Sequence, residues 1–266
     1  MRCAVVGDPI DHSLSPALHR AGYAACELDW QYDAHRVPAG TLAEFVAGLL
    51  PHHVGLSVTA PLKREALALA VRASDIAVLA GAANTLARGD GGWVADNTDV
   101  GGAVAALAER GCRRVSSGTV IGGGATAAST GLALAELGAE RIRLLVRTPA
   151  NAEAAATAVR SHPAHPEVEV HPLEAPMLGD VVVSTIPASA QDPALSARMA
   201  DVPVVFDVLY DPWPTPFARA ATGVVVGGLD LLVHQAAEQF RIFTGRAAPL
   251  AGMRAAGEQA LAARRS

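Results

Sequence analysis

Short apolar runs alternate with amphipathic segments along the chain, and this alternation predicts an α/β fold. Runs rich in Val, Ile and Leu, bounded by Gly, Pro and Asp, predict strands near residues 2–7, 30–37, 53–58, 86–89, 93–95, 119–121, 141–146, 168–170, 181–183, 204–208 and 224–226. Leucine and alanine at helical spacing predict helices near residues 16–26, 42–50, 63–72, 74–79, 101–109, 125–137, 152–159, 229–243 and 253–263.

Two late strands are apolar at consecutive positions rather than at alternate ones, apart from Asp207 near the end of the second. The runs at 181–183 and 204–208 are typical of parallel strands that are covered on both faces. Open parallel sheets bind ligands beyond the carboxyl ends of their strands. We therefore expect the segments 185–187 and 210–212, which follow these two strands, to lie near a ligand.

Composition narrows the class of protein. With 266 residues, of which 51% are hydrophobic and 18% charged, the chain can bury one large core or two modest ones. A net charge of −5 argues against nucleic acid or an anionic membrane as a partner. The three cysteines have no Cys-x-x-Cys spacing and are typical of free thiols in a reducing compartment, and no long uncharged apolar run occurs. We expect a cytoplasmic protein.

One residue stands out within this composition. Lys63 is the only lysine among the 21 lysine and arginine residues. Arginine stays protonated at any working pH, whereas a protein environment can lower the pKa of a lysine enough for it to exchange a proton. Lys63 follows a predicted strand and Pro61, in the first turn of a predicted helix, where the helix dipole disfavours a cation. This placement makes Lys63 a candidate for acid–base chemistry, and a chance survivor on a solvated face is the alternative.

A second candidate site lies near the N-terminus. Ser13 and Ser15 precede Pro16, so that Ser15 is predicted to cap the helix that starts there, with Leu18, Tyr23 and Ala24 among the residues of its buried side. Two hydroxyl groups and the free amides of a helix N-terminus form a natural seat for a carboxylate. Simple helix capping explains either serine equally well.

Further polar residues occur where apolar segments end. Asn84 and Asp99 are predicted to lie on loops beside strand ends, where functional residues are common, although each alone could be a turn residue. Gln235 is a neutral polar residue among leucines and alanines of a predicted helix, where burial in the core is the alternative. His162 and His165 lack the spacing of metal ligands, so they are predicted to lie at the surface and no metal site is expected.

The middle of the chain carries a dinucleotide-binding fingerprint. Gly122, Gly123, Gly124, Ala125 and Thr126 follow one predicted strand and open a helix, and a second strand comes after it. The glycines allow a tight turn and a close approach of pyrophosphate to the backbone. The second strand ends at Arg147 and Thr148 rather than at an acid, which suits the 2′-phosphate of NADP. A solvated arginine is the alternative.

Taken in order, these motifs resemble those of the shikimate dehydrogenase family. The resemblance covers nearly the whole chain and includes Gly7-Asp8-Pro9-Ile10-x-His12-Ser13-x-Ser15-Pro16, Val58-Thr59-x-Pro61-x-Lys63, Ala83-Asn84-Thr85, Asp96-Asn97-Thr98-Asp99, the glycine fingerprint, Tyr210-x-Pro212 with Thr215-Pro216, and Gly228-Leu229 followed by Gln235. It implies an α/β protein of two domains with a cleft between them. Residues 1–100 plus 229–266 would form a substrate-binding domain with a mixed sheet, and residues 101–228 an NADP-binding Rossmann domain.

The resemblance also implies a role for each matching residue. The enzyme would interconvert 3-dehydroshikimate and shikimate with NADP(H), with Lys63 and Asp99 as the catalytic pair. Substrate would be bound by Ser13, Ser15, Thr59, Lys63, Asn84, Asp99, Tyr210 and Gln235. The cofactor would be bound by Gly122, Gly123, Gly124, Ala125, Thr126, Arg147, Thr148, Val208 and Gly228.

Three positions depart from the family pattern and keep alternatives open. Ser57 stands where many members have Asn, Val146 replaces an Asn before Arg147, and Asn151 stands where a second arginine often lies. The last two weaken the expected 2′-phosphate site, so NAD remains an alternative cofactor. Quinate remains an alternative substrate because it carries an extra hydroxyl beside the carboxylate and the sequence does not resolve that pocket. A nucleotide-sensing module without turnover is a more remote alternative, since it would not need both Lys63 and Asp99. The sequence leaves monomer and homodimer open.

Overall fold

The computed structural model describes residues 1–264 and divides into two compact units. The first unit comprises Met1–Thr98 together with the chain from Leu232 onward, and the second comprises Asp99–Leu231. Both boundaries fall inside helices, α5 (Thr98–Glu109) and α10 (Gly228–Thr244). Among the described residues, no helix is both long and apolar enough to cross a membrane.

The first unit contains a mixed six-stranded sheet in the order β2-β1-β3-β5-β6-β4. The strands β1, β2 and β3 pair in parallel, whereas β5 pairs antiparallel with both β3 and β6. The bounds are β1 (Arg2–Gly7), β2 (Gln31–Arg36), β3 (His53–Val58), β4 (Arg72–Ala73), β5 (Thr85–Gly89) and β6 (Gly92–Asp96). A hairpin joins β5 and β6, with Gly89 paired to Gly92.

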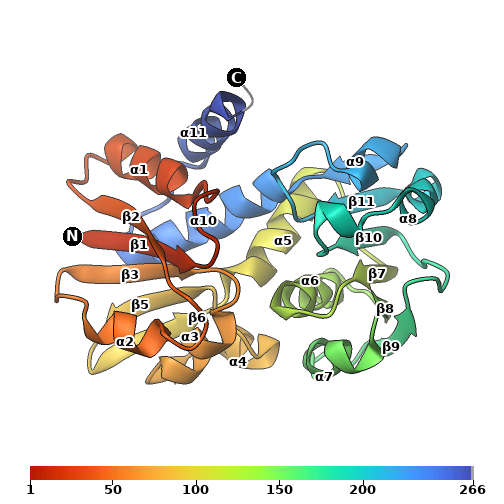
Figure 1. Ribbon diagram of the computed structural model, residues 1–266, viewed down its shortest axis with the longest axis horizontal. Helices are drawn as coiled ribbons and strands as arrows, with labels where there is room; N and C mark the ends of the chain where they lie inside the picture. The colour runs from red at the N-terminus through yellow and green to blue at the C-terminus, as the bar shows by residue number, and fades with distance from the viewer. Residues whose placement is uncertain (265–266) are drawn as a thin grey trace. The chain divides into compact units, whose positions relative to one another are not determined.

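Helices pack on this sheet from both ends of the chain. They are α1 (Ser15–Ala25), α2 (Leu42–Ala47), α3 (Lys63–Leu69), α4 (Asp75–Ala80), α10 and α11 (Leu250–Ala263). In Figure 1, α11 lies beside α1, although the two are far apart in the sequence. Side chains of α10 hydrogen-bond to β3 and to the turn before β5. Helix α10 therefore packs on the sheet of the first unit, and α11 packs on α1.

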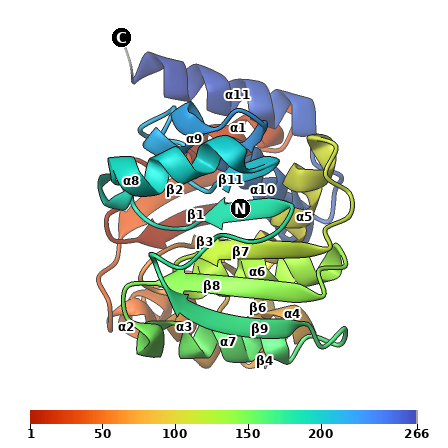
Figure 2. The ribbon, with the colours of Figure 1, turned by 90° about the vertical axis from the view of Figure 1, so that its right-hand side faces the viewer.

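The second unit is a doubly wound parallel sheet. Its order is β12-β11-β10-β7-β8-β9, and every neighbouring pair is parallel. Figure 2 shows β7, β8 and β9 running across the view one below another. The bounds are β7 (Ser117–Ile121), β8 (Arg141–Val146), β9 (Glu167–Pro172), β10 (Val181–Ser184), β11 (Val204–Asp207) and β12 (Val224–Val226). This is the strand order of dinucleotide-binding folds. The strands after β7 are added first on one side, as β8 and β9, and then on the other side, as β10, β11 and β12, so the switch point lies between β7 and β10.

One helix of the second unit precedes β7, and the others connect its strands. They are α5, α6 (Ala125–Glu136), α7 (Glu153–Arg160), α8 (Pro193–Ala197) and α9 (Pro216–Ala220), with 3-10 turns at Pro149–Ala152, Ala188–Ala190 and Arg198–Asp201. Strands β10 and β11 are buried at every position, as expected of parallel strands covered on both faces, and each is apolar except for its last residue, Ser184 or Asp207. The predicted fold class, α/β with a mixed sheet and a Rossmann-like unit, is confirmed.

Several local expectations are wrong. Helix α5 begins at Thr98, so that Asp99 lies in its first turn rather than on a loop. Ser15 is the first residue of α1 and does not cap it, since Leu14 holds the cap position, and Ala24 is exposed. His162 is buried: its Nδ1 accepts from the Ala164 amide, and its Nε2 lies 3.2 Å from a Glu136 oxygen.

Candidate active site

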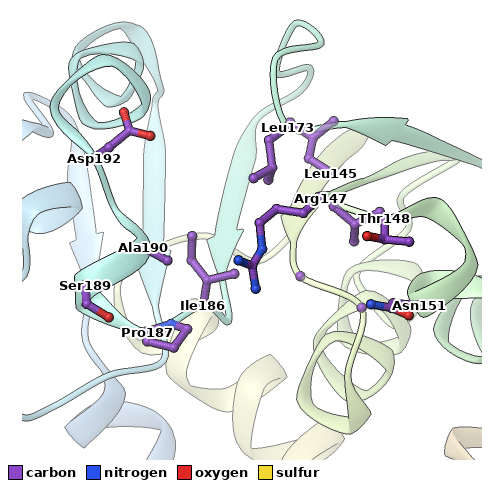
Figure 3. Close-up of a pocket in the computed structure, with 13 residues that line it drawn as sticks. Leu145, Arg147, Thr148, Asn151, Leu173, Ile186, Pro187, Ser189, Ala190 and Asp192 are labelled. Atoms are coloured by element: carbon purple, nitrogen blue, oxygen red, sulfur yellow. The ribbon is translucent and has the colours of Figure 1, made fainter.

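A pocket of about 580 Å³ opens in the second unit beyond the carboxyl ends of β7, β8 and β10. Figure 3 shows Arg147, Thr148 and Asn151 on one side, with Ile186, Pro187, Ser189 and Asp192 on the other. The remaining lining residues are Gly122, Gly123, Leu145, Val146, Leu173 and Ala190. Because the pocket lies at the switch point of the sheet, its position is the one at which such sheets bind ligands.

Two of the three glycines in the turn are packed so closely that side chains would not fit. Gly122 has φ +126°, and a Cβ there would lie 2.1 Å from Thr185 Oγ1, on the loop after β10. At Gly123 a Cβ would lie 2.8 Å from the Asn151 carbonyl oxygen and 2.9 Å from Ala152 Cα. Gly124 has open space around it and stands at the N-cap of α6. The turn therefore presents bare backbone toward the pocket, as a pyrophosphate site requires.

The cation predicted for the 2′-phosphate lies in this same pocket. Arg147 is exposed, and Figure 3 shows its guanidinium extending into the pocket toward Ile186. Thr148 and Asn151 line the pocket beside it, and the backbone N–H of Asn151 donates to the Thr148 carbonyl oxygen over 3.0 Å. Gly124, Ala125 and Thr126 do not line this pocket, since they stand at the start of α6. A guanidinium and a hydroxyl therefore lie near the glycine turn.

A buried carboxylate organises the end of β11. Asp207 accepts hydrogen bonds from Thr215 Oγ1 and Gln191 Nε2, each over 2.7 Å, and from the Leu209 amide over 3.2 Å. Burial raises the pKa of Asp207, and these hydrogen bonds partly offset the shift. The carboxylate thereby fixes the loop that carries Val208 and Tyr210.

The two residues predicted for the nicotinamide end are in direct contact. A Cβ on Gly228 would lie 2.2 Å from the Val208 carbonyl oxygen, and the Gly228 amide donates to the Leu209 carbonyl oxygen over 3.0 Å. The start of α10 is therefore pressed against the chain that leaves β11. Only a residue without a side chain allows this approach.

In the first unit, Lys63 is the first residue of α3 and is half-buried. The preceding turn is closed by a hydrogen bond from the Leu62 amide to the Thr59 carbonyl oxygen. The Thr59 amide in turn donates to the Val6 carbonyl oxygen, and the Ala83 amide donates to the Lys63 carbonyl oxygen over 2.8 Å. The backbone of Lys63 is thus tied to the turn that carries Asn84.

Asn84 stands just before β5 and is only 2% exposed. Its Nδ2 donates to Thr98 Oγ1 over 2.9 Å and to Gln235 Oε1 over 3.1 Å. Its Oδ1 accepts from the Thr98 amide and from Thr85 Oγ1, both over 2.8 Å. The structure therefore brings Asn84 and Gln235 together, and it fixes the Asn84 amide from four sides.

Ser13 and Ser15 lie together at the start of α1. The Ser15 amide points to Ser13 Oγ at 3.3 Å, and the Ser13 amide donates to the Ile10 carbonyl oxygen over 2.9 Å. The guanidinium of Arg264 reaches this loop from the end of α11, donating to the carbonyl oxygens of His12 and Ser13 over 2.9 and 3.4 Å. A serine hydroxyl and a helix N-terminus thus lie side by side.

Asp99 belongs to the second unit, where it is 6% exposed in the first turn of α5. Tyr210 also belongs to the second unit and is half-buried on the loop after β11. The pairing of Asp99 with Lys63, and the roles of all the predicted site residues, stay predictions.

The residues that hold the predicted site residues in place were not identified from the sequence. Thr98 and Gln239 hold Asn84, and Arg264 holds the Ser13 loop. Gln239 could have been noticed because it stands four residues after Gln235, on the same face of a helix. Nothing in the sequence indicated Arg264, which donates to residues at the opposite end of the chain.

These features define a class of protein. A doubly wound parallel sheet has a closely packed glycine turn at its switch point, and an open pocket there contains a guanidinium. Within the same chain, a second α/β unit holds a lysine at a helix N-terminus and an Asn–Gln pair. This combination is typical of a dinucleotide-dependent oxidoreductase with a separate unit for its small-molecule substrate.

Comparisons with known proteins name the family. Residues 5–86 match the model of the shikimate dehydrogenase substrate binding domain, and residues 228–256 match that of the shikimate 5′-dehydrogenase C-terminal domain. The shikimate dehydrogenase (NADP(+)) of Thermosynechococcus vestitus is 33% identical, over 97% of this chain and 94% of its own. The chain belongs to the shikimate dehydrogenase family, which confirms the resemblance seen in its motifs.

Solved structures agree with this assignment. The crystal structure of Mycobacterium tuberculosis shikimate dehydrogenase is 37% identical and superposes with a TM-score of 0.89, covering 97% of this chain and 99% of that one. The Thermus thermophilus shikimate 5-dehydrogenase in complex with NADP(H) and shikimate is 29% identical, with a TM-score of 0.87 over 98% of this chain and 99% of that one.

Proposed function

We propose that this protein catalyses the reversible, NADP-linked interconversion of 3-dehydroshikimate and shikimate, a step of aromatic amino-acid biosynthesis. The observation that carries the proposal is the pocket at the switch point of the second unit, where bare glycine backbone and Arg147 meet. A cofactor with a 2′-phosphate fits this chemistry, because Arg147 and Thr148 offer a guanidinium and a hydroxyl and no acid ends β8. Family membership supports the same activity.

Within this proposal the domain roles follow the two units. Residues 1–100 with 229–266 bind substrate, and residues 101–228 bind NADP. The Ser13 and Ser15 hydroxyls hold the substrate carboxylate with Tyr210 near it, and Thr59, Asn84, Asp99 and Gln235 contact the ring hydroxyls. Gly122, Gly123, Gly124, Ala125 and Thr126 hold the pyrophosphate, while Val208 and Gly228 lie at the nicotinamide end. The cytoplasm is the proposed location.

The chemistry rests on Lys63. When bound, NADPH supplies the hydride for the C3 carbonyl carbon of 3-dehydroshikimate. As negative charge develops on the carbonyl oxygen, the Lys63 ammonium stabilises it and donates the proton that completes the hydroxyl group. Asp99 orients Lys63 and an adjacent substrate hydroxyl. In the reverse direction, Lys63 takes the hydroxyl proton back.

Activity is tested by following absorbance at 340 nm with shikimate or quinate, each with NADP or NAD. We expect turnover with shikimate and NADP to exceed that of the other three pairs. An absence of signal with shikimate and NADP would overturn the proposal and favour a nucleotide-sensing role. Higher kcat/KM with NAD or with quinate would correct the cofactor or the substrate.

The role of Lys63 has its own test. Lys63→Ala should lower kcat by roughly a hundredfold or more with little change in the KM for shikimate, because a general acid–base group is lost. Lys63→Arg should fail as well, since its charge comes without a transferable proton. The matched control is Arg64→Ala, which removes the exposed neighbouring cation. Near-normal turnover of Lys63→Ala would remove Lys63 from the chemistry.

A further inference from the structure

A continuous chain of hydrogen bonds between buried side chains crosses the core of the first unit. Tyr32 OH donates to Ser57 Oγ over 2.5 Å, and Ser57 Oγ donates to Gln239 Oε1 over 2.7 Å. Gln239 Nε2 then donates to Thr85 Oγ1 over 3.0 Å, and Thr85 Oγ1 to Asn84 Oδ1 over 2.8 Å. The chain links edge strand β2, through β3 and α10, to the turn that carries Asn84. We call it the buried polar chain.

Its members are almost inaccessible to water. Tyr32 and Thr85 are 0% exposed, Gln239 1%, Asn84 2% and Ser57 4%. A buried polar group without a partner is costly, so each of these groups is held in the arrangement that satisfies the others. Disturbing one member should therefore propagate to its neighbours.

Three backbone groups fix which way the amide side chains face. The Asn84 carbonyl oxygen can only accept, so the atom of Gln239 that lies 3.0 Å from it is the nitrogen. The Thr98 amide can only donate, so the atom of Asn84 that lies 2.8 Å from it is the oxygen. In the same way the Leu232 carbonyl oxygen, 2.9 Å from Gln235 Nε2, turns the Gln235 oxygen toward Asn84.

The direction of every hydroxyl follows from these amides. Because Gln239 Oε1 accepts, Ser57 must donate to it, and the Ser57 oxygen is then free to accept from Tyr32. Burial raises the pKa of Tyr32, so its phenol stays protonated and able to donate. Because Thr85 Oγ1 accepts from Gln239, its own proton goes to Asn84 Oδ1. The buried polar chain therefore has one donor–acceptor order.

We propose that Gln239 is a positioning residue for substrate binding. Through its bonds to the Asn84 carbonyl oxygen and to Thr85, it holds the side-chain amide of Asn84 so that Asn84 Nδ2 faces Gln235. This inference rests on the proposed function, in which Asn84 and Gln235 contact the ring hydroxyls of shikimate. Gln239 itself contacts no substrate. Ser57, which stands where many family members have Asn, is the residue that holds the far side of the Gln239 amide.

The variants that test this are Gln239→Leu and Thr85→Val. The first removes all three hydrogen bonds of the amide, and the second removes only the hydroxyl that joins Gln239 to Asn84 while keeping the side-chain shape. Each should raise the KM for shikimate on the order of tenfold, with kcat changed less than threefold and the KM for NADP unchanged. Since both act through Asn84, the double variant should raise the KM little more than either single one.

The control is Ser74→Ala, also in the first unit. Ser74 caps α4, accepting from the Ala77 amide and donating to Asp96 Oδ1, so its loss should lower Tm without moving the KM for shikimate. If Gln239 were merely structural, its variants would behave likewise, with lower Tm and an unchanged KM, and that result would overturn the inference. Additive effects in the double variant would also overturn it. If the wild type itself does not oxidise shikimate, the proposed function fails, and this inference fails with it.

Discussion

The candidate residues of the two units are held by different forces. In the first unit, Asn84 and Gln235 are buried and bonded to other side chains, so their positions depend on a network. In the second unit, Arg147 is exposed at a pocket whose shape comes from backbone packed against backbone, as at Gly123. A network fixes donors and acceptors for one arrangement of hydroxyl groups, whereas a glycine turn with one exposed cation recognises phosphate charge.

This difference has a consequence for how each unit tolerates change. A substitution in the network should spread to residues that it does not touch, because every buried polar atom there depends on its neighbours. A substitution at an exposed pocket residue should stay local. The difference between the two units is therefore tested best by substitutions in the second unit that change the KM for one cofactor and not for the other.

The largest effect is expected at Arg147. Arg147→Ala should raise the KM for NADP about ten- to a hundredfold and leave the KM for NAD nearly unchanged, because only NADP has the 2′-phosphate that the guanidinium would bind. Steady-state kinetics with both cofactors measures this. The matched control is Arg141→Ala, at the opposite end of the same strand and likewise exposed.

An equal loss with NAD and NADP would mean that Arg147 does not discriminate at the 2′ position, and the contrast between the two units would weaken. Asn151→Arg sharpens the same test from the other direction. Asn151 lines the pocket beside Thr148, so a second guanidinium there should increase the preference for NADP.

A smaller effect is expected at the glycine turn. Gly123→Ala should lower the free energy of unfolding by about 1–3 kcal/mol, because the new Cβ meets backbone atoms that cannot swing aside. Thermal denaturation should show a lower Tm. Gly124→Ala is the control, since nothing lies within 4 Å of its Cβ position and its φ of −85° suits any residue. Equal Tm values for the two variants would contradict the packing argument.

The sequence predicted most of this architecture because the strands carry strong local signals. The apolar runs that begin β10 and β11 are visible without any knowledge of the rest of the fold. Helices α8 and α9 were missed because five residues are too few to show a helical period. The start of α5 was misplaced because Asp96-Asn97-Thr98-Asp99 is rich in turn-forming residues, and tertiary bonds from Thr98 to Asn84 determine its conformation instead.

The candidate site was predictable to the extent that motifs are local. Gly122 and Arg147 stand at strand ends that sequence alone identifies, and the structure places both at one pocket. The spacing of Gln239 to Gln235 places both on one helix face, but the partners of Gln239 were not predictable, because its bonds to Asn84 and Thr85 join residues more than 150 positions apart. Contacts of this kind arise from the packing of α10 on the sheet, which no local pattern encodes.

The smallest effect is expected where the first unit relies on surface bonds. Arg264 donates to the carbonyl oxygens of His12 and Ser13, just before α1 begins. Arg246 donates to the carbonyl oxygen of Cys26, just after α1 ends. Arg264→Gln should raise the KM for shikimate about two- to threefold, because exposed hydrogen bonds are worth little but these restrain the predicted carboxylate-binding loop. Arg246→Gln is matched in exposure and bond type and should leave that KM unchanged. An increase in both variants would mean that the segment from Arg246 to Arg264 supports α1 as a whole and not the Ser13 loop in particular.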